Sequence, residues 1–258
     1  MNQFPIVFGH YFKRNIKHPI NLLVYIGLPL ALAVLNMLGN IGVFQMQGGD
    51  LAAAADAVAA NATFIAVMFM VSFQFFSGEL LVEGIYDDLT EGSMRWRLFA
   101  SPVPQRTFLS GMALASWMFN IVQALVILGV TAIIFDVRWG NPFVLVAAIL
   151  LISVLSQLIA AFISQVSPKR KTATVTFNIL CFAMMFLSGM LFIPLGDSAV
   201  AMFIQQYATP LALGYRAILY AGPVFYNMSQ ALINLGILAA ITAVFAVLVF
   251  ALGRRRKA

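Results

Sequence analysis

Long apolar segments alternate with short polar ones along most of the chain. An α-helix needs about 20 mostly apolar residues to cross the hydrocarbon core of a bilayer. Six segments meet this requirement, and none shows the period-two alternation of a transmembrane β-strand. They are residues 20–44, 62–81, 108–134, 143–163, 173–193 and 228–252. The pattern predicts an all-α integral membrane protein with six transmembrane helices, forming a single transmembrane domain over residues 1–258.

The composition supports a membrane protein and excludes a soluble or disordered one. Hydrophobic residues make up 62% of the chain and charged residues 9%, against roughly 45–50% and about 25% in soluble domains. The single cysteine, Cys181, rules out an intrachain disulfide and a multi-cysteine metal site. The net charge of +6 would suggest nucleic acid as a partner of a soluble protein, but here the placement of the cations explains it, and no nucleic-acid partner is predicted.

The lysines and arginines lie almost entirely on one side of the predicted membrane. They precede the first span, follow the last, and fill the connections between spans 2 and 3 and between spans 4 and 5. Only Arg138 and Arg216 fall on the opposite side. Because positively charged loops remain cytoplasmic, both termini are predicted to be cytoplasmic.

The leader, residues 1–19, carries its own pattern. Phe4, Phe8, Tyr11 and Ile16 recur at nearly helical spacing, and three cations lie towards the end of the leader. This is typical of an amphipathic helix that lies in the membrane interface. The alternative is a positively charged flank that only orients the first span.

The connection between spans 2 and 3 is the most polar part of the chain. Asp88 and Glu91 have the spacing of a capping box at a helix start, and Glu91 and Arg95 are four residues apart in the favourable order. Leu98 and its apolar neighbours add a hydrophobic face. We predict a short cytoplasmic amphipathic helix over residues 86–100 that forms a docking surface; the alternative is a solvated connector.

The outer connection, residues 194–227, is long and largely apolar. Prolines and glycines break it into pieces that are each too short to span the membrane. Such pieces are predicted to form two re-entrant half-helices that dip into the outer leaflet and return. Arg216 lies within this segment, where a lone cation needs a partner, a cavity or lipid headgroups.

Sequence motifs for catalysis are missing. No lysine follows a glycine, which excludes the phosphate-binding loop of an ATPase in this chain. The only histidines, His10 and His18, have no metal-site or catalytic-triad spacing. No catalytic residue, metal ligand or cofactor site is predicted.

Several polar residues fall within or next to the spans. Glu79 and Glu83 lie on one helix face; Glu79 is either an ion or proton site, or both carboxylates are anchors paired with cations such as Lys169–Lys171. Buried amides either line a substrate path or hold helices together through hydrogen bonds. The amides considered for the path are Asn36, Asn120 and Gln123.

Two groups of motifs resemble a known transporter family. Residues 89–93, 97–103 and 108–111 read Leu-Thr-Glu-Gly-Ser, Arg-Leu-Phe-Ala-Ser-Pro-Val and Phe-Leu-Ser-Gly. Residues 186–194, 209–211 and 215–216 read Phe-Leu-Ser-Gly-Met-Leu-Phe-Ile-Pro, Thr-Pro-Leu and Tyr-Arg. Both groups resemble the membrane subunits of ABC-type exporters of the type 2 permease family, especially its drug-exporting branch. Thr209 stands where that family more usually has Asn.

The resemblance implies a permease subunit of an ATP-driven exporter. Its substrate would be hydrophobic or amphiphilic (a drug, an antibiotic or a lipid-like molecule), as in multidrug efflux, and it would work in a prokaryotic inner membrane. ATP and Mg would bind to a separate nucleotide-binding ATPase subunit, so this chain would carry no cofactor and would not be an enzyme by itself. A second copy or a paralogous permease would complete a dimeric conduit, formed chiefly by spans 1, 2 and 5.

The resemblance also assigns roles to individual residues. The residues implied for a coupling helix that docks on the ATPase are Asp88, Glu91, Gly92, Ser93, Arg95, Arg97 and Leu98. Those implied for the outer re-entrant gate are Gly189, Pro194, Pro210, Tyr215 and Arg216. The rival hypothesis is a stand-alone secondary transporter or sodium exporter that uses Glu79, and a third is a membrane scaffold without transport activity.

Overall fold

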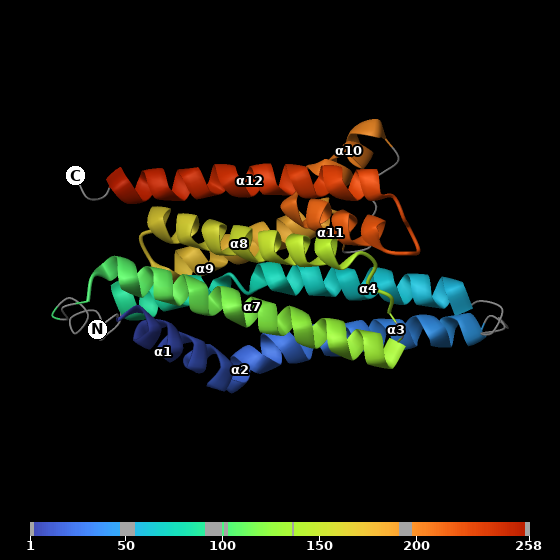
Figure 1. Ribbon diagram of the computed structural model, residues 1–258, viewed down its shortest axis with the longest axis horizontal. Helices are drawn as coiled ribbons and strands as arrows, with labels where there is room; N and C mark the ends of the chain where they lie inside the picture. Colours follow the sequence, from blue (N-terminus) through green and yellow to red (C-terminus); the bar gives the residue numbers. More distant parts are fainter. Residues whose placement is uncertain are drawn as a thin grey trace.

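The computed structural model describes residues 3–46, 55–90, 100, 103–135, 137–190 and 198–255, and these residues form helices without strands. Figure 1 shows the long helices lying side by side in one bundle, with both termini at the same end. The helices are α1 (Phe4–Lys17), α2 (Pro19–Leu22), the π-helix η1 (Leu23–Gly27), α3 (Leu28–Met46), α4 (Ala55–Phe76), α5 (Glu79–Gly84), the π-helix η2 (Ile85–Thr90), α7 (Gln105–Phe135), α8 (Pro142–Val166), α9 (Arg170–Leu187), α10 (Ala199–Tyr207), α11 (Pro210–Ala221) and α12 (Met228–Arg255).

Five helical stretches of the described residues are long and apolar enough to cross a membrane. They are Pro19–Gly39, Ala60–Thr90, Arg106–Phe135, Pro142–Val166 and Met228–Gly253. The predicted fifth span, residues 173–193, corresponds to α9, which is not among them. α9 has 18 residues and begins with Arg170 and Lys171, so its apolar part is shorter than the roughly 20 residues of a typical span. Five of the six predicted spans therefore coincide with a helix that is long and apolar enough to cross a membrane.

The second span continues well beyond residue 81, where the sequence pattern predicted its end. α4 is followed by a turn at Ser77–Gly78, and α5 and η2 extend the helical path to Thr90. Asp88 thus lies inside a helical segment, and the expectation that a new helix begins there is wrong. The helical path continues past the apolar run because the acidic residues there pair with arginines of other helices: Glu83 and Asp87 with Arg170, and Asp88 with Arg14.

The leader forms the predicted helix, α1, and packs along α7 (Figure 1). Val7 and Tyr11 are buried on the face towards the bundle. Gly111 of α7 permits the close approach, since a Cβ atom there would lie 2.7 Å from a methyl group of Val7. α1 is therefore packed on the bundle along one face.

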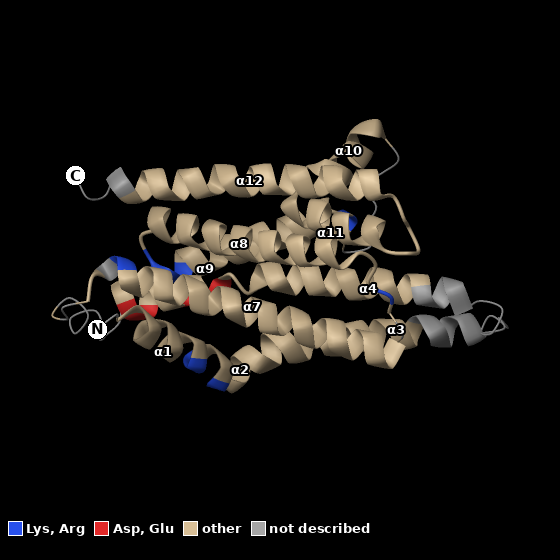
Figure 2. Ribbon diagram, in the orientation of Figure 1, with Lys and Arg blue, Asp and Glu red and all other residues tan. Residues whose placement is uncertain are grey.

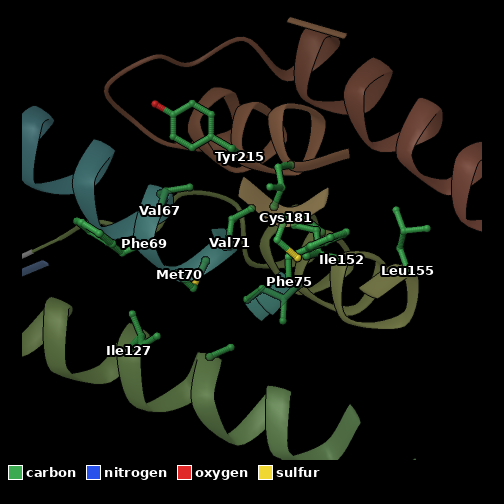
Figure 3. Close-up of a cluster of buried hydrophobic side chains, with 14 of the residues drawn as sticks. Val67, Phe69, Met70, Val71, Phe75, Ile127, Ile152, Leu155, Cys181 and Tyr215 are labelled. Carbon is green, nitrogen blue, oxygen red and sulfur yellow. The ribbon is translucent and has the colours of Figure 1, made fainter. Parts of the chain in front are cut away.

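The second span is the centre of the bundle. Its most apolar 18-residue window is 83% buried, against 11% for the last span. Figure 3 shows Met70 and Phe75 of α4 among side chains from α7, α8, α9 and α11. Phe75 stacks on Phe177 of α9 with ring centroids 6.3 Å apart. Groups placed on α4 and α5 are consequently in contact with most of the other helices.

Two short helices, α10 and α11, connect α9 to α12 at the end of the bundle opposite the termini (Figure 1). Ser198 caps α10 by accepting a hydrogen bond from the Ala201 amide. Thr209 caps α11 by accepting one from the Ala212 amide at 3.1 Å, and Pro210 occupies the first turn. With 9 and 12 residues, each helix is too short to span the membrane.

Candidate functional site

Charged residues gather at the end of the bundle that carries the termini (Figure 2). Arg170, at the start of α9, donates hydrogen bonds to Glu83 of α5 at 3.0 Å and to Asp87 of η2. All three side chains are partly exposed. Because exposed ion pairs contribute little to stability, this cluster mainly fixes how α9 is positioned against the end of the second span.

A second ion pair joins the leader to the same region. The Arg14 guanidinium donates to the Asp88 carboxylate at 2.6 Å, and Asp88 is buried. The guanidinium also lies 4.8 Å from the centre of the Tyr11 ring. Burial raises the pKa of the Tyr11 phenol, and the charge and hydrogen bond of Asp88 raise that pKa further. α1 is thereby tied to the last turn before residues 91–99.

Glu79 lies where three helices meet. Its carboxylate accepts hydrogen bonds from the Tyr25 hydroxyl of η1 at 3.3 Å and from the Asn178 amide of α9 at 3.0 Å. Among the described residues it has no ion pair, whereas Glu83 pairs with Arg170. The anchor interpretation therefore fits Glu83, and Glu79 is held by neutral donors.

The joint between α4 and α5, Ser77–Gly78, is enclosed by three other helices. Ser77 donates a hydrogen bond to the Asn120 side chain of α7. Ser156 of α8 donates to the Phe75 carbonyl, and a Cβ atom on Gly78 would lie 2.7 Å from Phe177 of α9. Sequence reasoning did not single out this joint, although two small residues within an apolar run are a signal of close packing.

The three candidate path amides are placed on two helices. Asn120 is fully buried at the α4–α5 joint, where it accepts the Ser77 hydrogen bond. Gln123 of α7 is fully buried, and neither of its polar side-chain atoms has a hydrogen-bond partner among the described groups. Asn36 is half-buried on α3. The hydrogen bond of Asn120 therefore joins two helices, as expected if the buried amides hold helices together rather than line a substrate path.

The predicted gate residues lie around α9, α10 and α11. Gly189 follows the end of α9 with a φ of 73°, a left-handed conformation that glycine adopts without a steric cost. Tyr215 is buried with its ring edge-on to Phe64 of α4, at a centroid distance of 5.3 Å. Arg216 lines a cavity next to α10.

Several predicted site residues lie outside the described part of the chain. They are Glu91, Gly92, Ser93, Arg95, Arg97, Leu98 and Pro194. Of the predicted coupling residues only Asp88 is described, and it contacts the leader helix. Within the described ranges, no group of three or more His, Cys, Asp or Glu residues could hold a metal ion.

Comparison with protein families matches residues 23–251 to the family described as "ABC-2 family transporter protein". No curated protein matches the chain in sequence. The family match covers most of the chain, including all five apolar helical stretches in whole or in large part. The membrane proteins of this family carry no cofactor, and ATP binds to a separate nucleotide-binding subunit. The chain therefore belongs to the ABC-2 transporter family, as a multi-pass membrane permease that is not catalytic by itself.

Proposed function

We propose that the chain is one permease of a dimeric ABC exporter, which moves a hydrophobic or amphiphilic substrate outward across a prokaryotic inner membrane. The observation that carries this proposal is the meeting of η1, α5 and α9 at Glu79. These segments belong to spans 1, 2 and 5, which the family resemblance implies for the path between two permeases. A half-buried carboxylate held by neutral donors suits the polar part of an amphiphile.

The apolar surface beside this site supports a paired permease. Large apolar side chains are exposed on one face of α9 and along α2, η1 and α3. Exposed apolar side chains on membrane helices contact either lipid or another protein. In the proposed dimer, part of this surface contacts the second permease and part faces the substrate. The exposed residues are Ile20, Leu22, Leu23, Leu28, Leu35, Leu38, Val175, Ile179, Phe182 and Phe186.

The proposed topology has six spans with both termini in the cytoplasm. α9 serves as the fifth span, and α10 and α11 are the re-entrant pair. The charged cluster of Figure 2 then lies at the cytoplasmic end, since cations concentrate there. α1 lies at the same interface, where its Arg14 pairs with Asp88 of η2, the segment that precedes the proposed coupling residues 91–98.

Isolation of the complex tests the exporter proposal. The tagged chain, purified in a mild detergent, should retain a nucleotide-binding ATPase subunit at about one copy per permease. Glu91→Lys should abolish substrate-driven ATP hydrolysis and leave the folded permease intact, because the reversed charge opposes the contact with the ATPase that the family resemblance implies for Glu91. Mass spectrometry of the complex and an ATPase assay in vesicles measure both effects. A chain that purifies alone and transports without ATP would contradict the proposal.

Glu79 offers the second candidate function, ion-coupled transport. If the complex is a substrate exporter in which Glu79 only contacts polar groups, Glu79→Gln should reduce transport less than about threefold. The amide oxygen still accepts from Asn178, and the amide NH₂ group can donate to the Tyr25 hydroxyl, which both donates and accepts. Transport of substrate and of ²²Na⁺ into inverted vesicles should be compared with Glu83→Gln as the control. A sodium flux that Glu79→Gln eliminates and Glu83→Gln preserves would favour the ion exporter.

A further inference from the structure

A small polar cavity lies beside α10 and α11. Its volume is about 260 Å³, several times the roughly 30 Å³ that one water molecule occupies in the liquid. Each lining residue is polar: one guanidinium, two phenols and three carboxamides. They are Gln206, Tyr207, Arg216, Tyr220, Asn227 and Gln230. A cavity of this size and composition suits a compact group that accepts several hydrogen bonds.

Arg216 gives the cavity its charge. One of its terminal nitrogens donates to the Tyr220 hydroxyl at 3.3 Å, while its Nε atom is buried without a hydrogen-bond partner. No carboxylate among the described residues forms an ion pair with it, and residues 198–230 contain no Asp, Glu or Lys. A half-buried cation without a counter-charge is costly in an apolar setting. The cavity therefore favours an anion.

The rest of the lining supplies further donors. The Asn227 side-chain oxygen accepts from the Gln230 backbone amide at 3.2 Å, which leaves the Asn227 NH₂ group as the part available to a ligand. The side chains of Gln206 and Gln230 form no described hydrogen bond with the protein. A planar guanidinium surrounded by neutral donors is well suited to phosphate oxygens.

Exposed apolar side chains lie close in sequence to the residues that line the cavity. Val200 and Phe203 of α10 are 68% and 62% exposed. Residues 224–226, directly before Asn227, expose Val224, Phe225 and Tyr226 by 42% to 68%. In a membrane protein, such side chains beside a polar cavity contact the acyl chains of a lipid whose headgroup occupies the cavity.

We propose that this cavity binds the phosphodiester headgroup of a membrane lipid, at the end of the bundle opposite the chain termini. The single negative charge of a phosphodiester matches the single guanidinium of Arg216. The glycerol and acyl chains then follow the exposed side chains of α10 and residues 224–226. The site needs neither ATP nor transport, so its test is independent of the exporter proposal.

Native mass spectrometry of the full-length, delipidated chain tests the site. Dioleoylphosphatidylglycerol and dioleoylphosphatidylcholine should both bind, and dioleoylglycerol, which lacks the phosphate, should bind at least about tenfold more weakly. R216Q should weaken phospholipid binding about tenfold. R138Q removes the same charge from a connector outside the cavity and should leave the affinity unchanged.

Y220F keeps the Arg216 charge and removes the phenol hydroxyl that contacts it, so phospholipid binding should weaken severalfold even where R216Q does not yield folded protein. Inorganic phosphate, added at millimolar concentration, distinguishes a lipid from a free anion. Displacement of all bound lipid by phosphate alone would overturn the lipid assignment. Equal binding of dioleoylglycerol and the phospholipids, or wild-type affinity in both R216Q and Y220F, would overturn the site itself.

Discussion

Gly78→Ala should destabilise the permease by about 3 kcal/mol, the upper part of the range for overpacked sites. The added methyl group would lie 2.7 Å from the Phe177 ring and 2.9 Å from the Ser156 carbonyl oxygen. The Ser156 carbonyl group belongs to the backbone of α8 and cannot rotate away as a flexible side chain can. To relieve the clash, α5 would have to move away from α8 and α9. Such a displacement would separate Glu79 from Asn178 and Glu83 from Arg170. We expect a lower melting temperature in detergent and loss of transport in vesicles.

Gly129→Ala is the matched control for this variant. Gly129 lies within α7, a span of the same bundle, and a Cβ atom there would meet nothing within 4 Å. Because alanine is the better helix former by about 1 kcal/mol, Gly129→Ala should be neutral or slightly stabilising. Equal melting temperatures for the two variants would contradict the close packing described at Gly78.

The arrangement of spans follows from the sequence because it depends on local composition. A run of about 20 apolar residues predicts a span wherever it occurs, and the polar stretches between them mark the connections. The end of the second span was harder to predict. Glu83, Asp87 and Asp88 look like the start of a soluble loop, but each pairs with an arginine from a segment more than 70 residues away. The local composition of the sequence gives no indication of partners that are so distant along the chain.

In the candidate sites too, the sequence predicted the local features but not the contacts between distant segments. The helical spacing of Glu79 and Glu83 placed them on one face, yet it did not indicate that Arg170 would pair with only one of them. Tyr25 and Asn178 are 54 and 99 residues from Glu79 in sequence, so their contact depends on the packing of three helices. For Arg216 the sequence predicted a need for a partner or cavity, and the structure provides the cavity.

Asp88→Ala should destabilise the permease by about 3 kcal/mol and uncouple ATP hydrolysis from transport. The lower end of the range for breaking a buried ion pair applies, because the Arg14 side chain is 36% exposed and its charge stays partly solvated. The variant removes the tie between α1 and the turn that leads into residues 91–99. Under the proposed topology this turn leads into the coupling helix, so closure of the ATPase would no longer move α1 and the second span together.

Reversal of the pair separates the ionic contact from other effects of the mutation. Arg14→Asp alone should resemble Asp88→Ala, and the double variant Arg14→Asp/Asp88→Arg should regain at least half of the lost melting temperature and ATPase stimulation. Lys13→Asp changes the same charge at the neighbouring exposed position of α1 and should leave both properties near wild type. Recovery is expected only if the two side chains act through each other, since two independent lesions would add. A double variant as impaired as the sum of the single variants would show that Arg14 and Asp88 contribute separately, and that the leader does not act on the coupling region through this contact.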